Sequence, residues 1–540
     1  MPVTSIGQQA FSNCTKLTNV TIGSAVTSID SWGFRGCTGL TNITIPSSIK
    51  SIGKQVFLNT GYYNNASNWE DGVLYIGEYL IVAKADITGE YAVKNGTKVI
   101  AGCAFMDCIK LTGVTIPNGV TNIGGNAFAG CTLLTNIAVP NSITSIESST
   151  FEDCTNLQSI AIPDSVTSIG DYAFCECTSL ANITIPHNVT NIGSGAFWKC
   201  ASLTSIDIPN SVTNISGSAF THCINLENVT IGNGLTALSA GTFGDTAFYN
   251  NESNWDNDGI LYIGNYLLDA KEDISGEYAV KEGTKVIAAY AFSECSSLTK
   301  ITIPDGVKNI WGGTFDGCTS LVNVTIPNSV VSIEYRAFYE CNSLTNIAIP
   351  NSVRTIGDHA FFKCYKLESI NIPDNVTSIG RYVFAACDSL TSITIPNSVP
   401  NIGEFAFSSC DSLTSVTIGN GVTSIGDYAF DYCDSLTSVT IGNSVTSIGG
   451  EAFSYCSSLK SITIPDSVTS IGREAFSGCS SLTSVTIGDS VTSIGEYAFN
   501  NCTNLASIKY RGTEEQWATI SKSNARIPTS CVITYEYTSE

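Results

Sequence analysis

Cysteine is the residue type best able to do chemistry in this chain of 540 residues, which has 21 cysteines, three histidines and two methionines. Most of the cysteines recur every 23 residues within blocks, and only Cys103, Cys175 and Cys531 fall outside the series. Such spacing could indicate disulfides or a metal array, but zinc ligands cluster as Cys-x-x-Cys pairs, and the sequence contains none. We therefore predict a column of buried free thiols that act as small apolar filler.

Carboxylates are the next candidates, because Asp388, Asp411 and Asp434 stand 23 residues apart and could form a calcium ladder. In other repeats the same position holds mostly threonine, serine or asparagine, whose short side-chain oxygens cap turns. Turn capping accounts for all of these oxygen-bearing residues, whereas calcium binding accounts for the three aspartates only. The histidines share no repeat position and form no Ser–His–Asp grouping. We predict no catalytic residue, no metal site and no cofactor, and we expect that the protein is not an enzyme.

The charge balance bears on the class of partner. The chain has 25 basic and 47 acidic residues, a net charge of −22, so nucleic-acid binding through phosphate neutralisation is excluded. No apolar run approaches the roughly 18 residues that a membrane-spanning helix needs. The first five residues are neither basic nor apolar, so we find no signal peptide and expect that the N-terminus is truncated.

These residues are positioned by a 23-residue repeat that phenylalanine marks. The repeat that begins at Phe430 reads Phe-Asp-Tyr-Cys-Asp-Ser-Leu-Thr-Ser-Val-Thr-Ile-Gly-Asn-Ser-Val-Thr-Ser-Ile-Gly-Gly-Glu-Ala, and positions are numbered below from that phenylalanine as 0. One unit cannot bury its own apolar residues, but stacked units can. The marking residues are Phe11, Phe34, Phe57, Phe105, Phe128, Phe151, Phe174, Phe197, Phe220, Phe243, Phe292, Phe315, Phe338, Phe361, Phe384, Phe407, Phe430, Phe453, Phe476 and Phe499.

Each repeat predicts one strand, one short extended segment and one turn. Leu-x-x-Val-x-Ile alternates with period two and is rich in β-branched residues, which is typical of a half-buried strand. Proline at +12 lacks the donor that a continuing ladder needs, so the strand ends there. Val-Thr-Ser-Ile then forms a second extended segment, and Ala-Phe-x-x-Cys predicts a turn of α- or 3-10 helix opposite. Glycine at −4 is replaced so often that we expect close packing there, not positive φ.

The pattern Leu-x-x-Val-x-Ile-Pro-x-x-Val-x-x-Ile-Gly-x-x-Ala-Phe-x-x-Cys resembles the BspA-like leucine-rich repeat family, whose 23-residue repeat is also called the Treponema pallidum type. The resemblance covers nearly the whole chain. It implies an α/β, β-rich fold: a right-handed leucine-rich-repeat solenoid of about 20 coils, with a long parallel sheet on one face and short helical or 3-10 turns opposite. It also implies location at the cell surface or secretion, and some members bind host matrix proteins.

Strand alternation places +8 and +10 outward on the sheet face. Threonine at +10 and serine or asparagine at +8 give this face a nearly uncharged polar surface. It could dock an extended partner or order water, and the alternative is that an exposed strand simply accepts soluble side chains. The candidate contact ladder consists of Thr394, Thr417, Thr440, Thr463 and Thr486.

Two matching inserts interrupt the array where the phenylalanine spacing grows from 23 to 48 and 49 residues. Each contains Leu-Tyr-Ile-Gly-x-Tyr-Leu, which predicts a hairpin around the Gly-x turn. Tyrosine and tryptophan are what a sugar or peptide pocket would use, so the candidate ligand-binding residues are Tyr63, Trp69, Tyr249 and Trp255. The alternative is that these rings fill the contact between the hairpin and the edge of the solenoid.

The domain organisation follows from the spacing of the repeat phenylalanines and the position of the two inserts. We predict leucine-rich-repeat coils at 1–57, 105–243 and 292–508, aromatic hairpin inserts at 58–104 and 244–291, and a C-terminal cap at 509–540. In the cap, Thr513 and Gln516 predict a capping box on a short helix, and Cys531–Tyr537 predicts a strand. Val3 and Ile6 already belong to a coil, so we expect an uncapped N-terminal edge that self-associates.

The sequence therefore favours a non-enzymatic, surface-displayed binding or adhesion module that recognises host or matrix macromolecules, either protein or glycan, along a long shallow surface. One alternative is a structural spacer that holds another domain away from the cell. A second alternative is glycan recognition by the two aromatic inserts.

Overall fold

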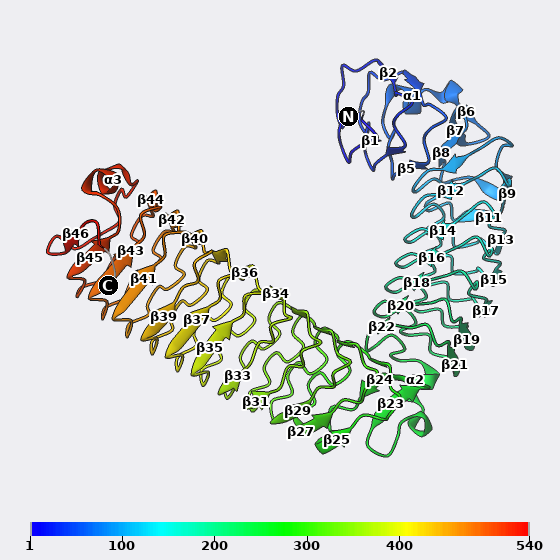
Figure 1. The fold of residues 1–540 in the computed structure, drawn as a ribbon. Helices are drawn as coiled ribbons and strands as arrows, with labels where there is room; N and C mark the ends of the chain where they lie inside the picture. The colour runs from blue at the N-terminus through cyan, green and yellow to red at the C-terminus, as the bar shows by residue number, and fades with distance from the viewer. Residues whose placement is uncertain (1–2, 538–540) are drawn as a thin grey trace. The chain divides into compact units, whose positions relative to one another are not determined.

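The computed structural model describes residues 3–537 and divides the chain into two compact units. One unit comprises Met1–Asp256 and Leu261–Gly264, and the other comprises Asn257–Ile260 and Asn265–Glu540. Each unit is a stack of similar coils, as Figure 1 shows. Together they make about 23 turns, which confirms the predicted leucine-rich-repeat solenoid.

Within each sheet, the first strand of a coil, at +8 to +11, pairs in parallel with the same strand of the next coil. Paired residues lie 23 positions apart in the sequence, so Ser392 pairs with Ser415, and Ser415 pairs with Ser438. Pairing is continuous over groups of two to four strands in either unit, so the predicted long sheet is a row of shorter parallel sheets. In these strands the residues at +9 and +11 point inward and those at +8 and +10 point outward.

In the first unit these sheet-face strands are β2 (Asn19–Thr21), β4 (Asn42–Thr44), β9 (Thr88–Ala92), β11 (Lys110–Thr115), β13 (Asn136–Ile137), β15 (Ser159–Ile160), β17 (Asn182–Ile183), β19 (Ser205–Ile208) and β21 (Asn228–Ile231). In the second unit they are β25 (Ser275–Ala279), β27 (Ser297–Thr302), β29 (Asn323–Thr325), β31 (Asn346–Ile347), β33 (Ser369–Ile370), β35 (Ser392–Ile395), β37 (Ser415–Ile418), β39 (Ser438–Thr440), β41 (Ser461–Ile464), β43 (Ser484–Ile487) and β45 (Ser507–Tyr510).

A second, two-residue strand at +17 and +18 lies on another side of each coil, and Figure 1 shows the two series separately in either unit. In the first unit this series is β1 (Ser5–Ile6), β3 (Ser28–Ile29), β5 (Ser51–Ile52), β10 (Val99–Ile100), β12 (Asn122–Ile123), β14 (Ser145–Ile146), β16 (Ser168–Ile169), β18 (Asn191–Ile192), β20 (Asn214–Ile215) and β22 (Ala237–Leu238). In the second unit it is β26 (Val286–Ile287), β28 (Asn309–Ile310), β30 (Ser332–Ile333), β32 (Thr355–Ile356), β34 (Ser378–Ile379), β36 (Asn401–Ile402), β38 (Ser424–Ile425), β40 (Ser447–Ile448), β42 (Ser470–Ile471) and β44 (Ser493–Ile494).

The third side of each coil consists of turns around the phenylalanine, where the sequence predicted α- or 3-10 helix. In all 20 coils the residues at −2 and +2 have positive φ, which no helix accommodates. The backbone N–H groups at −2, 0 and +2 instead donate to carbonyls of the next coil, as Phe105 N does to Ala127 O at 2.7 Å. These bonds between coils replace the bonds within a helical turn, and we call this side the turn face.

The core is a set of columns that run along each stack. The rings of Phe338, Phe361 and Phe384 stack with centroid distances of 5.2 and 5.3 Å, so residues 23 apart lie directly over one another, as predicted. The leucine at +6 and the cysteine at +3 form further columns, and in interior coils such as that of Leu367 and Cys364 neither side chain is exposed. Because each side chain packs against its own kind above and below, one repeat suffices to specify a dry interior.

The glycine at −4 marks a corner where neighbouring coils approach closely. None of the residues at −4 has positive φ. A β-carbon on Gly449 would lie 2.6 Å from the carbonyl carbon of Gly426 in the preceding coil. The prediction of close packing at this corner is therefore confirmed.

The first insert forms α1 (Gly61–Asn64), a 3-10 turn at Ala66–Asn68, β6 (Trp69–Glu70), β7 (Val73–Ile76) and β8 (Tyr79–Ala83). β7 and β8 are antiparallel, while β8 pairs in parallel with β10, so the hairpin takes a place in the second strand series. The second insert forms α2 (Ala247–Asn250), a 3-10 turn at Glu252–Asn254, β23 (Ile260–Ile263) and β24 (Tyr266–Ala270), and β24 pairs in parallel with β26.

The C-terminal segment continues the stack with α3 (Glu514–Thr519) and β46 (Val532–Thr534). Both hydrogen bonds of the predicted capping box are present, between Thr513 and Gln516. β46 pairs in parallel with β45, which confirms the predicted strand. Trp517 is buried against Tyr510, so α3 covers part of the last coil. Among the described residues, no helix has the length and apolar character needed to cross a bilayer.

Candidate binding surfaces

The aromatic residues of the first insert form a packed corner. The side chain of Thr60 caps α1 by accepting a hydrogen bond from Tyr63 N at 3.0 Å. The rings of Tyr63 and Trp69 meet edge to face with centroids 5.2 Å apart, and Trp69 Nε1 donates to the Tyr63 carbonyl at 2.8 Å. Both residues are half-buried. The indole N–H group of Trp69 is therefore hydrogen-bonded inside the protein, whereas a sugar-binding site would direct it outward.

The second insert reproduces this corner with its own residues. Tyr249 and Trp255 meet edge to face at 5.1 Å, and Trp255 Nε1 donates to the Tyr249 carbonyl at 2.8 Å. Thr246 caps α2 in the manner of Thr60. The structure brings together the two candidate residues of each insert, and the identical geometry indicates that the motif shapes a turn of the backbone.

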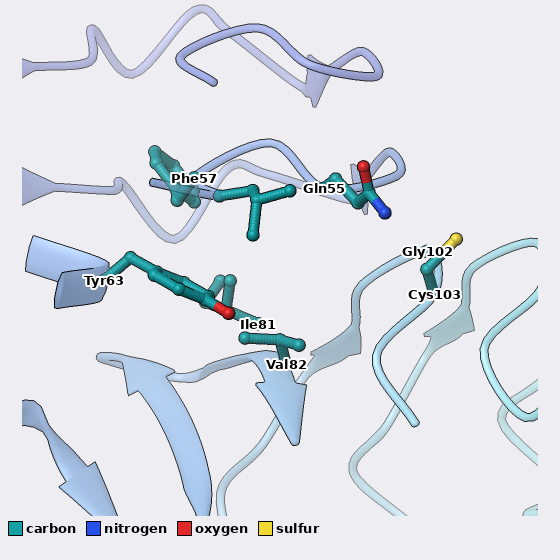
Figure 2. Close-up of a pocket in the computed structure, with 8 residues that line it drawn as sticks. Gln55, Phe57, Tyr63, Ile81, Val82, Gly102 and Cys103 are labelled. Carbon is teal, nitrogen blue, oxygen red and sulfur yellow. The ribbon is translucent and has the colours of Figure 1, made fainter. Parts of the chain in front are cut away.

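A small cavity lies beside Tyr63, where the insert meets the preceding coil (Figure 2). Figure 2 shows the ring of Tyr63 pointing from α1 toward Ile81 and Val82, below Phe57. The cavity measures about 30 Å³ and its lining is mostly apolar. A ligand pocket generally needs several hundred Å³, whereas this space suits one water molecule. It is too small for a monosaccharide.

The threonine ladder on the sheet face lies open to solvent in the second unit. Thr394 pairs with Thr417, and Thr417 with Thr440, at the spacing of adjacent strands. These three side chains and that of Thr463 are exposed, and Thr486 is partly exposed. Among the described residues, none of the five hydroxyls is within hydrogen-bonding distance of a protein partner. The ladder therefore presents unused donors and acceptors.

A different threonine column shows what a structural hydroxyl does in this fold. At +16, the hydroxyl of Thr446 donates to the carbonyl of Thr423, and that of Thr469 donates to the carbonyl of Thr446, both at 3.0 Å. Thr423 and Thr492 make the equivalent bond. The +16 column joins neighbouring coils, and the +10 ladder does not. This contrast makes the +10 ladder the better candidate for external contact.

Apart from Cys14, which is exposed, the cysteines at +3 are buried free thiols, as predicted, but they are more than filler. Fifteen of them donate to the carbonyl of the phenylalanine one coil earlier, with Sγ–O distances of 2.9 to 3.3 Å. Burial raises the pKa of Cys410 and of Cys502 to about 12. A thiol held in its neutral form is a poor nucleophile and a poor metal ligand.

The histidines are dispersed in the fold. His187 is exposed, and His222 Nδ1 lies 3.1 Å from Asp245 Oδ2. His359 stacks on Tyr382 with centroids 4.8 Å apart, and burial lowers its pKa. Across residues 3–537, no three histidine, cysteine or acidic side chains are grouped as a metal site would require.

The first coil has an open apolar side. A hollow of about 560 Å³ is lined by residues that include Val3, Ile6, Phe11 and Val20. Val3 is 69% exposed and Phe11 is 43% exposed, although the phenylalanines of interior coils are fully buried. Phe11 stacks on Phe34 with one face only.

The turn face carries aromatic side chains that sequence reasoning missed. At −2 the rings of Tyr382, Phe405 and Tyr428 stack with centroid distances of 4.5 and 4.4 Å. At +2 the rings of Tyr432 and Tyr455 stack at 4.6 Å. The available signal was the recurrence of aromatic residues at −2 and +2 in adjacent repeats, which becomes informative once both positions are known to point outward.

Comparison with known proteins agrees with this architecture. The profile of the family described as BspA type leucine rich repeat region matches residues 1–89, 83–165, 146–274, 285–411 and 377–506. No curated protein is similar enough to the chain to count as a match.

Solved structures of several bacterial proteins are similar to the chain. A leucine-rich repeat protein from Bacteroides ovatus is 26% identical, with 86% of this chain and 99% of that chain covered and a TM-score of 0.37. A leucine rich cell surface protein from Faecalibacterium prausnitzii is 30% identical, with 70% and 92% covered and a TM-score of 0.33. The leucine rich repeat protein of T. pallidum is 22% identical, with 50% and 88% covered and a TM-score of 0.24.

Proposed function

The chain belongs to the BspA-type leucine-rich repeat family, and from that premise we propose that it is a surface-displayed adhesion module that binds host or matrix proteins through its sheet face. Repeat proteins of this kind generally bind protein partners, and their solenoid fold is typically non-enzymatic. Location at the cell surface is part of the proposal, and the description of the similar Faecalibacterium protein as a cell surface protein supports it.

The unused hydroxyls of the +10 ladder carry the proposal. A partner that lies along Thr394, Thr417, Thr440 and Thr463 meets donors and acceptors at every strand, and it displaces water without breaking a bond of the solenoid. The face holds few charges, so contact with it buries no unpaired ion. Affinity then grows with the number of coils engaged, which suits an extended macromolecular partner.

The test is the binding of the full chain to immobilised extracellular matrix proteins, measured by surface plasmon resonance. We expect replacement of Thr394, Thr417, Thr440 and Thr463 by alanine to weaken binding at least about tenfold. The matched control replaces Thr423, Thr446, Thr469 and Thr492 by alanine. It removes the same number of exposed hydroxyls, but these bond to the neighbouring coil, so binding should persist while stability falls.

A structural spacer is the alternative if the chain binds no matrix protein at all. Glycan recognition by the inserts is the other alternative, and the inward hydrogen bonds of Trp69 and Trp255 weigh against it. Glycan-array binding that disappears in the Trp69→Ala plus Trp255→Ala variant would establish that alternative. Binding that both threonine variants lose equally would contradict the sheet-face proposal.

The open side of the first coil is a second contact surface in this proposal. Its apolar hollow and the exposed ring of Phe11 support self-association with another copy of the chain. The exposed ring would then be covered as the interior phenylalanines are.

A further inference from the structure

The turn face contains three sites where a cation of the chain lies between a carboxylate and an aromatic ring. Lys199 Nζ lies 4.0 Å from the ring centroid of Trp198 and 2.8 Å from a carboxylate oxygen of Glu176. The Lys363 ammonium group pairs with Glu340 at 2.8 Å and lies 5.5 Å from the ring centroid of Phe362. In each site the carboxylate, ring and cation come from −2, +1 or +2 of one coil or of adjacent coils.

The third site shows the arrangement around a buried carboxylate. Asp316 occupies +1 and is 7% exposed. Arg336, at −2 of the next coil, places its guanidinium 3.0 Å from Asp316 Oδ2 and 3.7 Å from the ring centroid of Tyr339. The arginine thus neutralises the carboxylate and stacks on the ring.

Asp431 occupies the same +1 position with the same 7% exposure, but among the described residues it has no salt-bridge partner. Position −2 of the next coil, where Arg336 stands in the other site, is Glu451. Oδ1 of Asp431 is buried without a hydrogen-bond partner. Burial, followed by the charge of Glu451, raises the pKa of Asp431 to about 7. The site around Asp431 therefore contains a buried carboxylate, as the site around Asp316 does, but lacks a cation in the place of Arg336.

The surroundings reinforce this difference. Residues 382–459 contain no lysine, arginine or histidine, and their acidic residues are Asp388, Glu404, Asp411, Asp427, Asp431, Asp434 and Glu451. Only Glu404 has a salt-bridge partner among the described residues, and that partner is Arg381 from the preceding coil. Among the described residues, the remaining six carboxylates form no salt bridge with a cation of the chain.

Exposed rings lie beside these carboxylates. Tyr432 is 48% exposed and Tyr455 is 42% exposed, and the two stack on each other. The position of Tyr432 holds Ser409 one coil earlier, so Tyr432 has a ring neighbour on one face only. Phe405 and Tyr428, which are partly exposed, form a parallel stack at −2. We call Phe405, Tyr428, Asp431, Tyr432, Asp434, Glu451 and Tyr455 the turn-face patch.

We propose that the turn-face patch binds an arginine-bearing segment of a protein partner, with a guanidinium between Asp431 and Glu451 in the place that Arg336 takes beside Asp316. The planar guanidinium matches paired carboxylates and stacks on tyrosine, which an ammonium group does less well. The patch lies on the turn face, a side of the coil different from the sheet face. The inference rests on the proposed function only in that both assume a protein partner.

The test uses the full chain and a fluorescent peptide of alternating arginine and glycine, with binding followed by anisotropy. Length-matched peptides that contain lysine, citrulline or glutamate in place of arginine separate charge from shape. We expect the arginine peptide to bind most tightly, the lysine peptide more weakly, and the neutral citrulline and acidic peptides not at all. Raising the salt concentration should weaken the binding.

Three variants locate the site. Asp431→Asn with Glu451→Gln should weaken arginine-peptide binding about tenfold or more, and Tyr432→Ala should weaken it by several fold. The matched control, Asp164→Asn with Asp374→Asn, removes two exposed carboxylates elsewhere and should leave binding unchanged. Tyr432→Leu keeps the bulk of the side chain, so a loss in this variant as well assigns the effect to the aromatic ring.

Several outcomes would overturn the inference. Equal losses in the patch variant and the charge-matched control would mean that net charge alone attracts the peptide. The inference would also be overturned if the lysine peptide or spermine bound as tightly as the arginine peptide and Tyr432→Ala had no effect on binding. The two proposals fail separately: matrix binding that persists without arginine-peptide binding refutes only the patch, and the reverse result refutes only the sheet face.

Discussion

At the scale of single residues, the fold repeats one environment many times and so fixes the reactivity of whole columns. Eighteen of the cysteines are buried, whereas Cys14 is exposed and Cys103 and Cys531 are partly exposed. In the native protein, a thiol reagent at pH 8 should label these three and leave the others unmodified, because a pKa near 12 leaves almost no thiolate.

The control for this labelling experiment is denaturation, after which all 21 cysteines should react without added reductant. Mass spectrometry of the labelled chain counts the modified sites in both states. Fast native labelling of +3 cysteines other than Cys14, or a denatured count far below 21, would contradict the burial of free thiols.

The side chain of Asp431 should by itself make the stability of the folded state depend on pH. Its folded-state pKa of about 7 lies above the value of about 4 in an unfolded chain, so the folded state binds this proton more tightly. This contribution to stability is complete below pH 4 and is lost as the pH rises toward 7. Asp431→Asn cannot ionise, so the variant should be more stable than the parent above pH 7 by about 2–4 kcal/mol.

Urea unfolding at several pH values measures this effect. Asp434→Asn is the matched control, because Asp434 belongs to the same coil and is exposed. If Asp431→Asn left the slope of stability against pH unchanged between pH 4 and 7, the carboxyl group would not carry the effect.

At the scale of elements, adjacent residues of one corner differ sharply in the space around them. A β-carbon on Gly449 would lie within 2.7 Å of backbone atoms of the preceding coil, whereas one on Gly450 would find no atom closer than 3.5 Å. Gly449→Ala should therefore lower the free energy of unfolding by about 1–3 kcal/mol through forced backbone shifts. Gly450→Ala should leave it unchanged or raise it slightly. Thermal unfolding of the two variants decides between these expectations, and equal effects would contradict them.

The elements also show what a repeat pattern can and cannot reveal. Period-two alternation was enough to find strands such as β37, and the spacing of phenylalanine was enough to find the core columns. The left-handed backbone at −2 could not be predicted, because Tyr382, Phe405 and Arg336 stand there and such residues disfavour positive φ on their own. Hydrogen bonds between coils override that preference.

The candidate surfaces were predictable only as sets of exposed residues. Thr440 and Thr446 belong to the same repeat and look equivalent in the sequence, yet only the hydroxyl of Thr446 bonds to the neighbouring coil. Likewise, Asp316 and Asp431 occupy one repeat position, and the distinction between them lies in position −2 of the next coil. These differences arise between coils, so a single repeat does not contain them.

At the scale of the whole molecule, the open side of the first coil should govern association. We expect the average mass in sedimentation equilibrium to rise above 57.1 kDa with concentration, because covering Val3 and Phe11 removes apolar surface from water. Phe11→Gln should shift this rise to higher concentration. Ile109→Gln, which changes an exposed apolar residue elsewhere, is the control. A constant single-chain mass at every concentration would contradict the expectation.

The uniform register of the coils bears on how such a chain changes length over generations. Loss of residues 408–430 would leave Asp431 following Phe407, and the core columns of phenylalanine, cysteine and leucine would continue without a gap. Slippage or unequal recombination within the gene can therefore shorten or extend the stack by one unit of 23 codons while leaving both ends intact. Selection can tune the reach of the protein in this way without having to find a new fold.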